Sequence, residues 1–218
     1  MIPHSSDAGA VDSRDGVGAR YGPDAIRICL DRPPVNALTV ETLQCLGAIL
    51  AEAHEDPRPV LLTGASGIFS AGFDIKHPAP DQLTIDAAAH RVLAGTAERT
   101  GLVVAAVEGA AIGLGLLVAA SADVLVVSRN ARIQMPEVRL GIAADVRPLR
   151  RFLSDGWIRR LSLLGEQYTA EQLHLDCAGA VLCEPGGSAD RAEEIIAAAA
   201  GPGAAAIQMM KRHLTGPG

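Results

Sequence analysis

Residues 69–117 decide the fold; they open with FSAGFD at residues 69–74 and reach EGAAIGLG at residues 108–115. Each of these two glycine-marked turns follows a short apolar run typical of a buried strand, VLLT at residues 60–63 and LVVAAV at residues 102–107. Glycine permits backbone conformations and close approaches that a side chain would forbid. The second turn leads into an Ala/Leu-rich helix, whose first N–H groups have no partner within the helix. Two turns that each offer a free N–H group predict a site that binds an oxyanion.

The composition indicates a globular protein with a core of small aliphatic side chains. Of the 218 residues, 49% are hydrophobic but only 3% are aromatic, so Ala, Val, Leu and Ile must fill the core. The net charge is −6 and no stripe of Lys and Arg is visible, which argues against nucleic acid as a partner. The four cysteines lack any metal-binding spacing, so we expect reduced thiols in a cytoplasmic protein without a bound metal.

Two segments bear on targeting. Residues 1–20 are polar and rich in Gly and Asp, so we expect a flexible leader rather than a signal peptide. Residues 102–127 are apolar apart from Glu108 and Asp123, and they contain the small-xxx-small pattern of membrane helices. Glu108 and Gly109 separate a β-branched half from an Ala/Leu-rich half, which favours a buried strand, a turn and a helix. We therefore predict no membrane span.

The rest of the chain alternates apolar strands with amphipathic helices. Thr39 and Asp81 are placed to cap two early helices, and Thr169 with Gln172 forms a capping box. The expected strands cover residues 25–30, 60–63, 102–107, 123–127, a short run ending near 133, and 180–182. The expected helices cover residues 40–55, 82–99, 113–121, 146–153, 157–164, 169–175, 188–200 and 204–214. Repeated β-β-α units followed by helices predict a sheet-centred α/β core with a helical tail.

Six segments, taken together, resemble the enoyl-CoA hydratase/isomerase family, also called the crotonase family. They are DRPPVNAL at 31–38, FSAGFDI at 69–75, AVEGAAIGLG at 106–115, the strand at Asp123, MPEVRLGI at 135–142 and YTAEQ at 168–172. Any one of them is a weak signal, but their order and spacing agree with the family over residues 25–214.

The resemblance implies a crotonase-like α/β spiral of β-β-α units. We expect the flexible leader at residues 1–20, the spiral core at residues 21–165 and a shortened C-terminal helical region at residues 166–218. It also implies an acyl-CoA or enoyl-CoA thioester as ligand, with coenzyme A entering as part of the substrate and no separate cofactor. The family assembles as trimers or pairs of trimers, so a homo-trimer or hexamer is expected.

The resemblance also assigns roles to individual residues. The backbone N–H groups of Phe73 and Leu114 take the place of the family's oxyanion hole, although the family usually has glycine at the second position. The positions that correspond to binding of coenzyme A and the acyl group are Pro34, Val35, Ala37, Ala71, Phe73, Asp74, Ile75, Leu117, Pro136 and Leu140.

Only one of the two glutamates that hydratases of the family use is present. The first position falls on Leu117, whose side chain cannot transfer a proton, and the second falls on Glu137. A single buried base is enough to move a proton between two carbons, as isomerases of the family do. The other interpretation of Glu137 is a structural carboxylate paired with Arg139 or Arg132.

Asp145 lies eight residues after Glu137, where a CoA-thioester dehalogenase of the family carries its nucleophile, so it is a candidate second carboxylate. Alternatively, Asp145 caps the helix expected at residues 146–153. His77 and His90 are expected to be structural. The sequence contains neither a P-loop lysine nor a full GxGxxG with a downstream acid, which argues against ATP or NAD.

Three functional hypotheses follow. The first is an enzyme that acts on acyl-CoA through an enolate, with Glu137 as acid and base. The second is a catalytically inactive acyl-CoA-binding protein, which the aliphatic Leu117 and the Leu114 side chain favour. The third is a structural subunit that keeps only an assembly surface.

Overall fold

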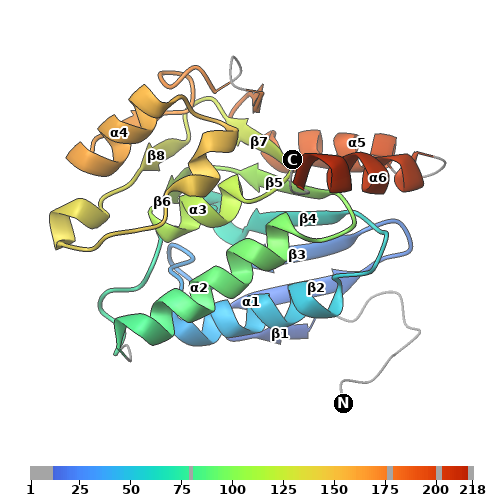
Figure 1. Cartoon of the computed structure of the whole chain (residues 1–218), viewed down its shortest axis with the longest axis horizontal. Helices are drawn as coiled ribbons and strands as arrows, with labels where there is room; N and C mark the ends of the chain where they lie inside the picture. Colours follow the sequence, from blue (N-terminus) through green and yellow to red (C-terminus); the bar gives the residue numbers. More distant parts are fainter. Residues whose placement is uncertain (1–11, 79–80, 176–178, 200–202, 216–218) are drawn as a thin grey trace.

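The computed structural model describes residues 12–78, 81–175, 179–199 and 203–215. Within these residues, seven strands form the main sheet in the order β1-β2-β3-β4-β5-β7-β10 (Figure 1). The first two strands, β1 (Asp12–Arg14) and β2 (Val17–Tyr21), are antiparallel. The others run parallel to one another: β3 (Ile26–Leu30), β4 (Val60–Gly64), β5 (Val103–Val107), β7 (Val124–Ser128) and β10 (Val181–Cys183).

In each β-β-α unit the first strand belongs to the main sheet and the second belongs to a smaller sheet. It contains β6 (Ala110–Ile112), β8 (Arg132–Gln134) and β9 (Gln167–Thr169). The chain passes from β5 in the main sheet to β6 in the small one, and then into α3 (Leu114–Ala120). It repeats this path from β7 to β8 and then into the 3₁₀ helix η2 (Glu137–Leu140). The predicted α/β fold of β-β-α units is confirmed.

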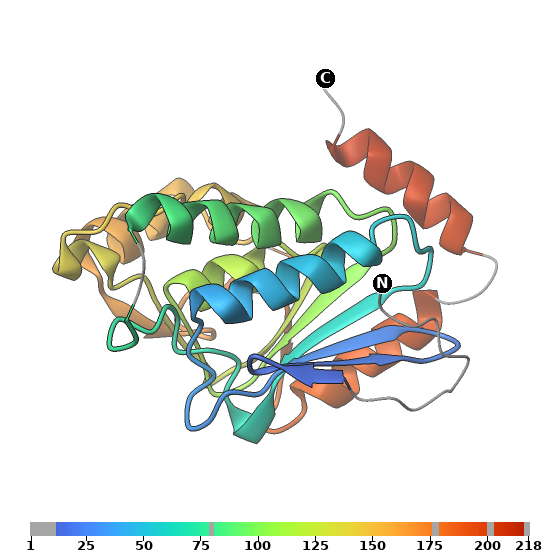
Figure 2. The same ribbon diagram turned by 90° about the horizontal axis from the view of Figure 1, so that it is seen from below.

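Helices cover both faces of the main sheet. Figure 2 shows α1 (Val40–Glu52), α2 (Gln82–Ala97) and α3 on one side, with α5 (Ser188–Ala199) on the other, where it contacts β4, β5 and β7. The remaining helical segments are η1 (Ala65–Gly67), η3 (Arg147–Arg151), α4 (Asp155–Leu164) and α6 (Ala204–Thr215).

The core between the sheet and these helices consists of aliphatic side chains, as the composition predicts. Ile26, Ile28 and Leu30 alternate inward along β3 and are buried, as expected for a half-buried strand. A larger cluster fills the space under α1, α2 and α3, and a smaller one lies under α5. The buried face of each helix thus fixes its place on the sheet.

The hydrogen bonds expected from three capping residues are present, and those of Thr39 and Asp81 begin α1 and α2. Thr39 Oγ1 accepts a hydrogen bond from the Thr42 N–H at 3.2 Å, and Asp81 Oδ1 accepts one from Thr84 at 2.9 Å. The reciprocal bonds of the capping box between Thr169 and Gln172 are also present, at 2.9 and 3.1 Å.

Two expected helices are wrong in type. The chain after the capping box forms turns up to residue 175 rather than a regular helix, and residues 176–178 lie outside the described residues. The helix expected at residues 146–153 is only the short 3₁₀ helix η3, which ends where Phe152, with φ −132°, leaves the helical conformation.

The expectation of a flexible leader over residues 1–20 is wrong for residues 12–20. Asp15 and Gly16, with φ of 48° and 76°, form a tight two-residue turn that pairs Arg14 with Val17 in a hairpin. Val17 and Ala19 then point into the core, 0% and 2% exposed. The dipeptide Asp15-Gly16 therefore indicates a hairpin, which the expectation of a flexible leader overlooked. Residues 1–11 lie outside the described residues.

The expected boundary at residue 165 also differs from the structure. The segment after residue 165 supplies β9 to the small sheet and β10 to the main sheet, so it belongs to the same layers as the core. At the end of the chain, Lys211 of α6 is 7% exposed and donates to Asp123 Oδ2 at 2.6 Å and to Gly101 O at 3.1 Å. This buried ion pair connects α6 to the start of β5 and β7.

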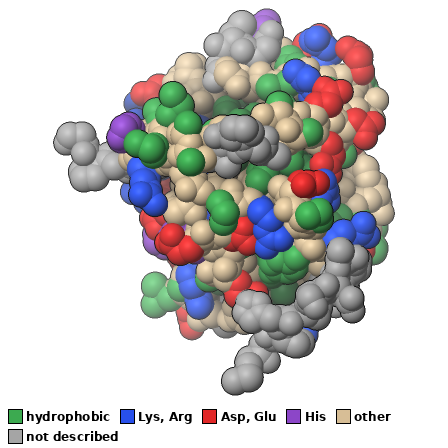
Figure 3. Space-filling model, turned by 90° about the vertical axis from the view of Figure 1, so that its right-hand side faces the viewer, with side chains coloured by type: hydrophobic (Ala, Val, Ile, Leu, Met, Phe, Trp, Pro, Cys, Tyr) green, Lys and Arg blue, Asp and Glu red, His purple; other side chains and the backbone are tan. Residues whose placement is uncertain are grey.

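The described surface carries mixed charges. On the face that includes α5 and α6, Figure 3 shows acidic and basic side chains interspersed with hydrophobic ones. Within the described ranges, no helix is both long enough and apolar enough to span a bilayer. Cys29, Cys45 and Cys183 form no disulfide bond with one another and are half-buried, and Cys177 is outside the described residues.

We predict that Val17→Ala lowers the free energy of unfolding by about 2 kcal/mol, because it removes two buried carbons from the core. Arg20→Ala, at an exposed position of the same strand, is the matched control and should change stability little. Urea unfolding followed by circular dichroism measures both. Equal stabilities for the two variants would show that the hairpin does not belong to the core.

Candidate active site

The first glycine turn, residues 69–74, is held by hydrogen bonds on both sides. Its amides donate to carbonyl groups at the start of β6 and two residues before it, to the loop at residues 35–38, and to one side chain of the turn itself. These bonds are Phe69 N to Glu108 O, Ser70 N to Ala110 O, Ala71 N to Val35 O, Gly72 N to Ser70 Oγ and Asp74 N to Leu38 O. Within the described part of the chain, the Phe73 N–H is the one amide of the turn with no acceptor.

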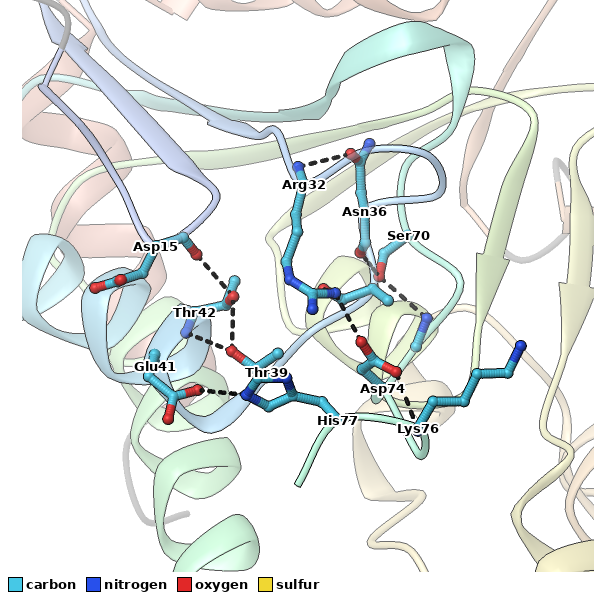
Figure 4. Close-up of polar contacts among 12 residues, drawn as sticks. Asp15, Arg32, Asn36, Thr39, Glu41, Thr42, Ser70, Asp74, Lys76 and His77 are labelled. Atoms are coloured by element: carbon cyan, nitrogen blue, oxygen red, sulfur yellow. Dashed lines mark hydrogen bonds and ion pairs between the residues drawn. The ribbon is translucent and has the colours of Figure 1, made fainter. Parts of the chain in front are cut away.

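A polar frame around Arg32 and Asn36 fixes this turn (Figure 4). Arg32 forms an ion pair with Asp74 at 2.8 Å, and the Asn36 side chain donates to Ile68 O at 2.7 Å. Ser70 Oγ donates to Asn36 O at 2.7 Å. Because both ends of the turn are held, the direction of the free Phe73 N–H is fixed by the fold rather than by a ligand.

The second turn brings another backbone N–H to the same place. Gly113 has φ 52° and ψ −126°, and its N–H donates to Gln134 O at 2.8 Å. Leu114 is the first residue of α3, so its N–H has no partner within the helix. A Cβ added to Gly72 would lie 2.7 Å from Ile112 O and 3.7 Å from Leu114 N. Only glycine at position 72 therefore lets the two turns touch.

Glu137 lies directly beside this pair. A Cβ on Gly113 would overlap its Oε1 atom, and its Oε2 atom is buried without a hydrogen-bond partner in the described residues. Burial raises the pKa of the Glu137 carboxyl, and the Leu114 N–H, which faces it, partly offsets that rise. Among the described side chains, neither Arg132 nor Arg139 forms an ion pair with Glu137. Arg139 instead donates to Leu164 O at 3.4 Å.

A cavity of about 570 Å³ opens next to these groups. Nine of the residues expected to form the site line it: Ala71, Phe73, Ile75, Leu114, Leu117, Pro136, Glu137, Leu140 and Asp145. Leu117 is 2% exposed and contributes an aliphatic surface to the cavity. The structure thus gathers the two turns, Glu137 and Asp145 around one space.

Four of the expected binding residues do not line this cavity. The backbone oxygen of Val35 accepts a hydrogen bond from the Ala71 N–H, and that of Ala37 accepts one from the Arg32 side chain. Arg32 also forms the ion pair with Asp74. Pro34 lies in the same loop. Their role in binding coenzyme A stays a prediction, while their observed role is to shape the first turn.

The α2 helix forms a wall of the cavity that sequence reasoning did not find. It contributes Gln82, Ile85, Asp86, Ala89, His90 and Leu93. Only His90 had been considered, and as a structural residue. The available signal was the repeat of polar and apolar side chains at every fourth position of this helix.

Asp145 lies at the rim of the cavity, exposed and bound to Arg147. It accepts hydrogen bonds from Arg147 Nε at 2.8 Å and from the Arg147 N–H at 3.0 Å. These bonds, above all the one to the guanidinium group, lower the pKa of Asp145 and keep it ionised at neutral pH. The N-cap position of η3 is Val146 rather than Asp145, so Asp145 lies one residue before the position expected for a cap.

The other polar groups near the turns have structural partners. His77 lies 3.8 Å from Glu41 and outside the residues that line the cavity (Figure 4). Across the residues that the structure describes, no cluster of three or more His, Cys, Asp or Glu side chains is arranged to hold a metal ion.

The site therefore places two backbone N–H groups and a buried carboxyl beside one cavity of an α/β fold built from β-β-α units. A family model for enoyl-CoA hydratase/isomerase matches residues 24–179. The chain belongs to the enoyl-CoA hydratase/isomerase family.

Relatives of known name are carnitinyl-CoA dehydratases from Salmonella enteritidis and Citrobacter koseri. Each is 33% identical over 162 residues, which cover 70% of this chain and 62% of the relative. The match thus spans less than two thirds of these relatives.

Among solved structures, Pseudomonas aeruginosa DspI has a TM-score of 0.83 at 24% identity, covering 96% of this chain and 90% of that one. An enoyl-CoA hydratase from Mycobacterium avium subsp. paratuberculosis has a TM-score of 0.83 at 23% identity, covering 94% and 86%. These similarities establish the shared fold.

We predict that Glu137→Gln stabilises the folded protein at neutral pH. Since folding raises the pKa of Glu137, the wild-type free energy of unfolding falls as pH rises from below the ordinary value of 4.5 through the folded pKa. The variant has no carboxyl to ionise at this position. Its free energy of unfolding, measured by urea titration, should therefore exceed that of the wild type by an amount that grows between about pH 4 and pH 7. Glu98→Gln, exposed at the end of α2, is the control. A difference in free energy of unfolding between variant and wild type that shrinks as pH rises would contradict the account.

Proposed function

We propose that the protein binds an acyl-CoA thioester and moves a proton next to its carbonyl group through an enolate. The observation that supports this most is that the Phe73 N–H, the Leu114 N–H and the buried Glu137 carboxyl, which the Leu114 N–H faces, all lie at one cavity. A thioester oxygen gains negative charge when the adjacent carbon loses a proton, and this is the charge that two aimed N–H donors stabilise. Loss of one such donor typically costs about 3–4 kcal/mol of transition-state stabilisation.

Glu137 is the proposed acid and base. Its ionised carboxylate takes a proton from the carbon next to the thioester carbonyl of a 3-enoyl-CoA, which leaves a dienolate. The same carboxyl then returns that proton to the carbon at the far end of the former double bond, which yields the 2-enoyl-CoA. The raised pKa strengthens the base, and no second group is required.

Addition or removal of water needs one more proton-transfer group. The family's usual position is Leu117, which is buried and aliphatic here. Asp145 lines the same cavity in the ionised form and is the proposed second carboxylate. The relatives named carnitinyl-CoA dehydratase make hydration and dehydration worth testing beside isomerisation. A cytoplasmic location and assembly as a homo-trimer or hexamer stay predictions, and analytical ultracentrifugation tests the assembly.

One observation favours a second candidate function, an acyl-CoA-binding protein without turnover. Leu114 and Leu117 place two large aliphatic side chains beside the site, where they narrow the space available to a reacting group. The backbone N–H of Leu114 is unaffected by its side chain, which is why we rank the enzyme first.

We predict that Glu137→Gln lowers kcat for isomerisation of a 3-enoyl-CoA by about 10²–10⁴, the usual contribution of a positioned acid or base. Acyl-CoA binding, measured by calorimetry, should persist because the backbone donors are unchanged. Glu98→Gln should keep the wild-type rate. Equal rates for wild type and Glu137→Gln would refute the role of Glu137, and binding without turnover in the wild type would favour the second candidate.

Asp145→Asn separates the two reactions. If Asp145 activates water, the variant loses hydration of 2-enoyl-CoA by about 10² or more while isomerisation continues. A coupled spectrophotometric assay with both thioesters measures this. An unchanged hydration rate would show that Asp145 has only a structural role, in the turn that it forms with Arg147.

A further inference from the structure

The α2 helix presents two parallel rows of side chains to the cavity. Ile85, Ala89 and Leu93 are half-buried and form an apolar row. The other row is polar, exposed at the rim, and consists of Gln82, Asp86 and His90. Residues four apart lie on one face of a helix, so each row is continuous along the wall.

The polar row carries a carboxylate that no cation neutralises. Gln82 Nε2 donates to Asp86 Oδ1 at 2.8 Å, and no Lys or Arg pairs with Asp86 in the described residues. His90, one turn later, lies close enough to Asp145 to lower its pKa, although less than Arg147 does. The row therefore runs from Asp86 toward Asp145, which lines the same cavity.

This arrangement is unfavourable for a plain hydrocarbon chain. An acyl chain laid along α2 would contact the apolar row but would also remove water from Asp86 without replacing its hydrogen bonds. A chain with a hydroxyl group would bury the same carbons and donate to the carboxylate. A carboxylate-terminated chain would place like charges together.

We propose that Asp86, with His90 beside it, selects acyl-CoA thioesters whose acyl chain carries a hydrogen-bond-donating hydroxyl group remote from the thioester. The inference rests on the proposed function, since it assumes that the thioester carbonyl lies at Phe73 and Leu114. Asp86 is then a specificity-determining residue and takes no part in the proton transfer.

The test compares enoyl-CoA thioesters of four to eight carbons in three forms: unsubstituted, hydroxylated at the last carbon, and carboxylated there. At the chain length that fits best, we expect kcat/KM for the hydroxylated thioester to exceed that of the unsubstituted one by about ten-fold, the value of one hydrogen bond to a charged group. Asp86→Ala should remove this preference, because it lowers kcat/KM for the hydroxylated form, which loses its hydrogen bond, and raises it for the unsubstituted form, which no longer desolvates a carboxylate. Glu98→Gln, with the same loss of charge on the same helix, should keep it.

The outcomes separate this inference from the proposed function. Turnover at equal rates for hydroxylated and unsubstituted thioesters, in wild type and Asp86→Ala alike, overturns the selection by Asp86 and leaves the function in place. If calorimetry detects no binding of any of the three thioester series, the proposed function and the inference fail together. A preference that survives Asp86→Ala assigns the selectivity to another part of the cavity and overturns the role of Asp86.

Discussion

The direct contact between two glycine turns is the constraint on which the rest of the site depends. Gly72 lies so close to the backbone of Ile112 that a Cβ would approach its oxygen to 2.7 Å. This contact sets the first turn against the start of α3, and the small sheet places both beside η2. Two N–H groups from segments about forty residues apart thereby share one cavity.

The burial of Glu137 that raises its pKa, and so suits it to proton transfer, also lowers the stability of the fold. A carboxyl buried beside Leu114, with one oxygen unpartnered, costs stability when it ionises, as its raised pKa indicates. The surrounding frame compensates, because Arg32, Asn36 and Ser70 satisfy the polar groups of the first turn with hydrogen bonds of 2.7–3.1 Å. The unpartnered Glu137 Oε2 atom lies where a ligand would bind.

Local signals predicted most of the fold. The caps at Thr39 and Asp81, the inward alternation along β3 and the two turns are read from a few neighbouring residues, and each was placed correctly. The hairpin at Asp15 and Gly16 was missed because the polar composition around it outweighed the turn signal. The helix α2 and the two rows of side chains along it can be read from the sequence, but its place as a wall of the cavity cannot, since that depends on how the β-β-α units stack.

The central claim is that Phe73 and Leu114 polarise a thioester carbonyl through their backbone N–H groups. Infrared difference spectroscopy of a bound acyl-CoA with a ¹³C-labelled carbonyl tests this directly. The account predicts a carbonyl stretch shifted to lower frequency than in water, in the wild type and equally in Glu137→Gln, because backbone donors cause it. A bound carbonyl that absorbs at its aqueous frequency would contradict the account.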